Sequence, residues 1–305
     1  MVMTKFKTEH LVPKPWPSAW DDGLLVLDLL NHDPVVLDLS SLPLHECLPS
    51  GVGDNASLMP MLLDLAKTPP DMRHALAHLM WRGAQRADPP VVCARLQGPA
   101  PIQDVATHLA GCLIGTDHRQ GQALWRFYDP HVFIHMAWLL RPAQLHALYG
   151  PCETWGLAWA GDWYELERPA APAQSDNTDP RPWWPDAKQW PSIQHVVDIE
   201  QVLARIASPA KPSIAQAPNV DRLLRFATED LHIRSDTDRR HYATYAAAFG
   251  QPFEHHAKLQ ALWPAVASGE VTLRQAMAQL STNDWELMRI MARTAKQTQS
   301  PTQHG

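Results

Sequence analysis

Histidines are the first residues of this sequence to suggest chemistry, because the chain contains 16 of them. His131 and His135 are four residues apart, so they share a face if this segment is helical, as two ligands of one metal ion must. No acidic residue lies between them, so they do not form the HExxH motif of zinc hydrolases. The neighbours His255 and His256 point to different faces of a helix. We therefore expect surface or half-buried histidines and no metal or other cofactor.

Other familiar catalytic patterns are also missing from the sequence. There is no GxSxG nucleophile motif, and none of the four cysteines lies in a recognisable protease or amidase context. The loop at 51–54 has two glycines but lacks the third glycine and the lysine-serine pair of phosphate-binding loops. Carboxylate pairs such as Glu165 and Glu167 lie on segments that we expect to be exposed. We predict no catalytic residues, and an enzyme whose site is assembled from distant residues is the alternative.

The corner at Trp125–Pro130 is the remaining candidate. Alternation of side chains over 123–128 predicts a strand. Asp129 can cap the helix that follows, and Pro130 can occupy its first position. Because buried charges are normally paired, we interpret Arg126 and Asp129 as an ion pair that holds this corner. An exposed charge at a binding cleft is the alternative.

The elements that position this corner belong to a mixed α+β lobe over residues 22–168, preceded by an N-terminal extension at 1–21. We expect a small sheet flanked by helices in this lobe. Apolar segments predict strands at 24–28, 90–96 and 123–128 and a hairpin around Gly161-Asp162, and helices are expected after Asp71, Pro101, Pro130 and Pro142.

Residues 169–191 contain six prolines and predict a linker rich in proline and tryptophan. Its tryptophans would be out of place in a disordered segment, so we expect its end to pack on a lobe. Helical spacing then predicts an all-α lobe over 192–296, followed by a polar, flexible tail at 297–305. The expected helices of this lobe lie at 195–206, 220–231, 236–249, 252–266, 272–280 and 283–295.

Composition narrows the class of protein further. The net charge of −6 argues against the basic face that nucleic-acid binding requires. No apolar run approaches the roughly 20 residues of a membrane span, and no signal peptide is visible. Four cysteines without CxxC spacing indicate free thiols in a reducing cytoplasm. The 13 tryptophans predict exposed aromatic surface and therefore a partner-binding role.

The segment Arg126-Phe127-Tyr128-Asp129-Pro130 resembles the RFYDP-type signature of the type VI secretion effector chaperones, or adaptors, a family also filed as domain of unknown function 4123. The surroundings are similar in order, over roughly residues 22–166. They comprise an opening strand at 24–28, the apolar segment at 58–65, a helix at 102–113 before the signature, and Pro142–Leu145, Gly150-Pro151 and Trp155 after it.

The resemblance implies a non-enzymatic role in bacterial toxin delivery. Such proteins bind one toxin effector, usually through its N-terminal region, and help to load it onto the VgrG spike of the secretion apparatus. They stay in the cytoplasm of the producing cell. We expect the first lobe to provide the scaffold and the helical lobe to provide specificity for the effector. An interaction module unrelated to secretion is a further alternative.

Six aromatic residues are our predicted partner contacts, with packing in the core or between lobes as the alternative for each. Three lie at the end of the linker and three in the helical lobe: Trp183, Trp184, Trp190, Tyr242, Tyr245 and Phe249.

Overall fold

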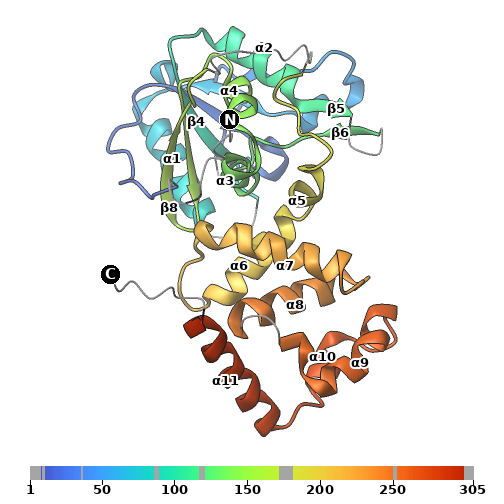
Figure 1. The fold of residues 1–305 in the computed structure, drawn as a ribbon. Coiled ribbons are helices and arrows are strands. Elements are labelled where there is room, and N and C mark those ends of the chain that lie inside the picture. The colour runs from blue at the N-terminus through green and yellow to red at the C-terminus, as the bar shows by residue number, and fades with distance from the viewer. Residues whose placement is uncertain are drawn as a thin grey trace, which may run out of the picture. The chain divides into compact units, whose positions relative to one another are not determined.

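The computed structural model describes residues 8, 11–35, 37–85, 89–116, 121–171, 181–249 and 253–298. For residues 31, 54, 249 and 291–298 it describes the backbone alone. The chain divides into two compact units, Met1–Ile193 and Gln194–Gly305. The first unit combines a sheet with helices and the second is helical, which confirms the expected fold class (Figure 1).

A six-stranded antiparallel sheet forms the centre of the first unit. Its order is β2 (His45–Glu46), β3 (Met61–Asp64), β1 (Leu24–Leu27), β4 (Val92–Gln97), β7 (Thr154–Trp159) and β8 (Asp162–Glu167). Ala160 and Gly161 join β7 to β8 and both have positive φ, as in a type I′ hairpin turn. A separate two-stranded sheet pairs β5 (Ile114–Thr116) with β6 (Gln122–Leu124).

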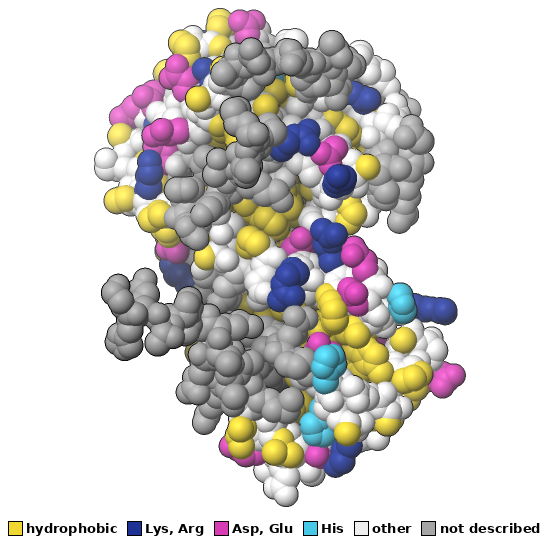
Figure 2. Space-filling view, viewed as in Figure 1, with side chains coloured by type: hydrophobic (Ala, Val, Ile, Leu, Met, Phe, Trp, Pro, Cys, Tyr) yellow, Lys and Arg dark blue, Asp and Glu magenta, His cyan; other side chains and the backbone are white. Residues whose placement is uncertain are grey.

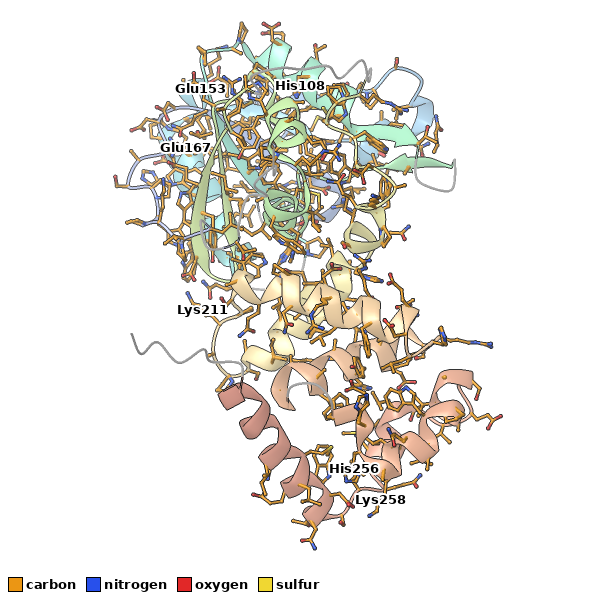
Figure 3. The ribbon with its side chains drawn as sticks, in the orientation of Figure 1. His108, Glu153, Glu167, Lys211, His256 and Lys258 are labelled. Atoms are coloured by element: carbon orange, nitrogen blue, oxygen red, sulfur yellow. The ribbon has the colours of Figure 1, made fainter. Side chains whose placement is uncertain are left out.

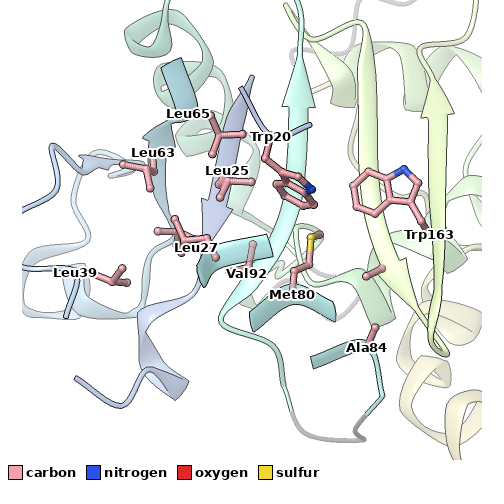
Figure 4. Close-up of a cluster of buried hydrophobic side chains, with 12 residues drawn as sticks. Trp20, Leu25, Leu27, Leu39, Leu63, Leu65, Met80, Ala84, Val92 and Trp163 are labelled. Carbon is pink, nitrogen blue, oxygen red and sulfur yellow. The ribbon is translucent and has the colours of Figure 1, made fainter. Parts of the chain in front are cut away.

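Helices cover both faces of the six-stranded sheet. On one face, Leu25, Leu63 and Trp163 pack with Met80 of α1 (Pro70–Ala84) in a buried apolar cluster (Figure 4). The opposite face packs against α2 (Ile102–Leu113), α3 (Pro130–Leu139) and α4 (Pro142–Tyr149). There, Phe133 of α3 stacks on Trp155 of β7 with ring centroids 4.1 Å apart. Short 3-10 helices lie at Leu29–Asn31, Gly53–Leu58 and Leu65–Lys67.

The second unit is built from helices joined by short loops. Its apolar positions recur at helical spacing, so α6 buries Ile199, Val202 and Leu203 on one side. The elements from the boundary onward are α5 (Trp190–Gln194), α6 (Val196–Ala207), a 3-10 helix at Ile214–Gln216, α7 (Ala217–Glu229), α8 (Asp236–Phe249), a 3-10 helix at Phe253–His255, α9 (Ala257–Ser268), α10 (Leu273–Met277) and α11 (Thr282–Thr298).

Side-chain contacts between helices hold this unit together. Arg240 of α8 binds Asp198 of α6 at 2.6 Å. The buried Asp238 of α8 accepts a hydrogen bond from the backbone N–H of Leu273 at the start of α10. No described helix combines the length and the apolar character needed to cross a membrane.

The predicted strand over 123–128 is wrong in its second half. β6 ends at Leu124, and Asp129 N donates to the carbonyl of Arg126, which closes a turn. Trp125 is 4% exposed and Phe127 and Tyr128 are fully buried. The apolar alternation therefore came from a turn that buries every one of its aromatic side chains.

Two helix starts also differ from the prediction. Asp71 does not cap α1, because the helix begins at Pro70 and Asp71 lies in its first turn. The helix expected over 252–266 is a 3-10 turn followed by α9, because His256 has extended backbone and interrupts the helix. The predicted linker and tail lie partly outside the described residues, which omit 172–180 and 299–305, and α11 continues to Thr298.

Candidate functional site

The charged corner lies where β1 ends and α3 begins. The guanidinium of Arg126 pairs with the carboxylate of Asp28, whose side chain is 2% exposed. Asp129 Oδ2 is 3.8 Å from the same guanidinium nitrogen. Asp129 also caps α3, because its Oδ1 accepts a hydrogen bond from the N–H of His131 at 3.0 Å, and Pro130 occupies the first helical position. The sequence therefore identified the cap but not Asp28, which precedes Arg126 by 98 positions.

Burial dominates the electrostatics of this corner. It raises the pKa of Asp129, although His131 and Arg126 oppose this effect. Burial also raises the pKa of Tyr128, and Asp28 adds to that shift. For Arg126, burial opposes the charge, but Asp28 and its other neighbours keep the pKa above its ordinary value. The corner is a paired charge cluster that joins β1 to α3.

Trp184 ties the end of the predicted linker to the first unit. Its Nε1 donates to the carbonyl of Thr116 in β5 at 2.7 Å. The indole lies against Gly115, where a β-carbon would overlap the ring. Its edge meets Trp125, with ring centroids 5.4 Å apart. The expectation that this segment packs on a lobe is confirmed.

The other two linker tryptophans also take part in packing. Trp190 is 7% exposed, and its ring centroid is 5.7 Å from that of Trp184. Trp183 is half-buried and edge-on to His108. Burial lowers the pKa of His108, whose Nε2 hydrogen-bonds the carbonyl of Leu148. Partner contact through the half-buried Trp183 and Trp184 stays a prediction.

Two of the three residues predicted as partner contacts in the second unit, Tyr242 and Tyr245, pack against other aromatic rings. Tyr242 is fully buried, and its ring centroid is 5.3 Å from that of Phe253. Tyr245 is half-buried, and its ring centroid is 5.9 Å from that of Trp285. The side chain of Phe249 lies outside the described residues. Tyr242 therefore has a core position, and Tyr245 retains some exposed surface.

His135 and the four cysteines are buried. His135 is fully buried and its Nδ1 accepts a hydrogen bond from Trp138 Nε1. Among the described residues, no group of three His, Cys, Asp or Glu side chains could hold a metal ion. Burial raises the pKa of Cys47, Cys112 and Cys152 to about 12, so these thiols stay protonated at neutral pH.

In Figure 3, His256 and Lys258 lie beside the start of α11. Asp284 accepts hydrogen bonds from Lys258 Nζ at 2.5 Å and from the backbone N–H and hydroxyl of Ser281 at 2.7 Å. His256 Nε2 is 3.5 Å from the same carboxylate. These contacts lower the pKa of Asp284, with Lys258 the largest cause. The group anchors the first turn of α11.

A groove between β2 and α2 is the main concave surface that we consider for binding, with a volume of about 630 Å³. One wall is β2 and the loop after it, where Leu48 is 40% exposed. The other wall is the side of α2 that carries Gln103, Thr107 and Gly111, with the buried Ala106 and Ala110 beside them. The sequence showed the buried face of α2, but its pairing with β2 depends on the fold.

Comparison with known proteins identifies one domain. Residues 36–147 match the family model described as Domain of unknown function (DUF4123). This span includes every residue that lines the groove and the whole Arg126–Pro130 segment. No curated protein and no solved structure matches the chain.

Proposed function

We propose that this protein is a non-enzymatic adaptor that binds a type VI secretion effector in the cytoplasm and promotes its loading onto the VgrG spike. The match of residues 36–147 to DUF4123 and the resemblance of Arg126–Pro130 to the chaperone signature support this role. The observation that carries it is the groove between β2 and α2, whose lining lies entirely within the matched domain.

The groove combines the features of a peptide-binding surface. Its floor contains the small side chains of Ala106 and Ala110, and its rim contains Gln103 and Thr107, which can fix the register of a bound segment. β2 is an edge strand, paired only with β3 among the described strands, so its outer edge can accept an extended segment. We assign the effector segment to this groove.

The proposed role predicts that genes for a toxin and a VgrG protein lie beside the gene for this chain. It is tested by co-expression of the full chain with those two proteins. We expect the chain to co-purify with the toxin and the toxin to reach VgrG only when the chain is present. Absence of a complex with either protein would contradict the proposed role.

The groove is tested by the Thr107→Trp variant, because Thr107 is exposed and lines it. An indole there fills the groove and should weaken effector binding about tenfold or more, with little change in melting temperature. Asp104→Trp is the matched control, since Asp104 is exposed on the same helix but does not line the groove. If both variants bind the effector equally well, the effector binds another surface of the protein.

A further inference from the structure

Within the part of the chain that the structure describes, the outer edge of β8 makes a backbone hydrogen bond at one residue, Trp163. Lys14 N donates to the carbonyl of Trp163 at 2.8 Å, so the backbone groups of Trp163 point away from β7. Backbone groups two residues apart on a strand point the same way, so those of Glu165 and Glu167 also face outward. No hydrogen bond joins these outward groups to any other described residue.

The same two residues make this edge acidic. Glu165 and Glu167 are two apart, so their carboxylates share one face, and both are solvent-accessible. In Figure 3, Glu167 lies near the end of β8 beside Glu153, and Figure 2 shows acidic side chains gathered at this margin. A strand added here therefore meets negative charge on the face that carries Glu165 and Glu167.

The chain itself shows how a basic segment fits this edge. Lys14 makes the backbone hydrogen bond to Trp163, and its Nζ lies 3.7 Å from Glu165 Oε1. Edge strands commonly carry charges that prevent unwanted pairing. Here the acidic charges instead suit a segment of opposite charge, and among the described residues Lys14 alone forms a bridge to this edge.

We propose that the open edge of β8 binds a protein partner by strand addition and selects an extended segment with Lys or Arg at alternate positions. The outward N–H and C=O groups of Glu165 and Glu167 provide the backbone hydrogen bonds, and their carboxylates provide the charge selectivity. This site goes beyond the proposed function. β8 and β2 are opposite edges of the sheet, so the groove and this edge can be occupied together.

Charge selectivity is tested with the full chain and a fluorescein-labelled peptide, Lys-Val-Lys-Thr-Lys-Val-Lys. We expect saturable binding that weakens with salt and falls about tenfold or more in the Glu165→Lys/Glu167→Lys variant. Glu153→Lys is the matched control, because Glu153 is exposed but lies opposite Arg168 in the hairpin, on the other face. A peptide with Glu in place of Lys should not bind.

Backbone pairing is tested by comparing Glu165→Gln with Glu165→Pro. Both remove the charge, and the proline also removes an outward N–H without touching the ladder to β7. We expect the proline variant to bind the peptide about fivefold more weakly than the glutamine variant. If the melting curve shows that the Glu165→Pro protein does not fold, Glu167→Pro is used in its place, because Glu167 is the last residue of the strand.

Two results would overturn the inference: no binding of the lysine peptide to the wild-type chain, or equal binding by the charge-reversed variant and the wild type. Neither result affects the proposed function, which is measured by effector co-purification and by Thr107→Trp. Loss of effector binding in Thr107→Trp with intact peptide binding would support two separate sites.

Discussion

At the scale of single residues, the pairing of Arg126 with Asp28 stabilises the charged corner between β1 and α3. A carboxylate that is 2% exposed is stable only when a partner compensates its lost hydration. Arg126 provides that partner while part of its own side chain remains in solvent. Its main role is therefore to hold β1 against the start of α3, which supports any binding surface on this unit.

Arg126→Ala should lower the free energy of unfolding by about 3 kcal/mol, because it leaves Asp28 buried and uncompensated. Effector binding should fall only as the folded fraction falls. Denaturant unfolding of the full chain measures the change. Adding Asp28→Asn to the Arg126→Ala variant should recover part of the lost free energy of unfolding.

The matched control is Arg141→Ala, whose ion pair with Asp186 is more exposed and should contribute under about 1 kcal/mol. An Arg126→Ala protein that melts like the wild type but fails to bind effector would make the corner part of the interface.

At the scale of elements, the segment that carries Trp184 is attached to the small sheet by a specific fit. The indole occupies the space that a side chain at Gly115 would fill, and Nε1 bonds the neighbouring carbonyl of Thr116. Polar contacts extend the attachment, since Gln189 Nε2 donates to the carbonyl of Leu139 at 2.9 Å. The segment is therefore part of the first unit rather than a free connection.

Gly115→Ala should displace Trp184 and lower the free energy of unfolding by about 1–3 kcal/mol, because the new methyl group overlaps the indole. Tryptophan emission should shift to longer wavelength as the ring enters water. Thermal unfolding and fluorescence spectra measure both effects.

Gly111→Ala is the matched control, because nothing lies within 4 Å of its added carbon and alanine favours the helix by about 0.5–1 kcal/mol. If Gly115→Ala is as stable as Gly111→Ala, with unchanged emission, the fit of Trp184 does not stabilise the segment.

At the scale of the whole molecule, both units expose large apolar side chains, and Val12, Val35 and Trp81 are examples in the first unit. In the second unit, Val197 on α6 is 65% exposed, and Leu287 and Ile290 on α11 are 54% and 50% exposed. Leu287 and Ile290 are three apart and therefore neighbours on the helix surface. If the helical unit supplies specificity for the effector, as we propose, Leu287 and Ile290 are candidate contacts.

Leu287→Ser/Ile290→Ser should weaken effector binding about tenfold, as expected for apolar interface anchors, without lowering the melting temperature. Isothermal titration of the full-length variant with purified effector measures the change. Val12→Ser in the first unit is the control, since Val12 is 62% exposed and belongs to neither the groove nor the helical unit. Unchanged binding in the double variant would place specificity in the first unit.

The parts of this fold that could be predicted are those whose structure depends on residues close together in the sequence. The cap at Asp129, Pro130 at the first helical position and the hairpin of β7 and β8 follow from local backbone preferences. The wrong prediction of a strand over 125–128 has the same origin, because alternating aromatic residues are typical of a strand. The folded structure shows instead a turn in which all of these aromatic side chains are buried.

By itself the sequence determined the fold class, most helices of the second unit and the resemblance centred on Arg126–Pro130, because periodicity, capping and short motifs act within a few residues. The tertiary structure decided that Arg126 binds Asp28, that Trp184 packs on Gly115, and that β2 and α2 form a groove. Each of these joins segments far apart in the chain. Ion pairing and packing depend on distance in space, which only the folded sheet and its helices establish.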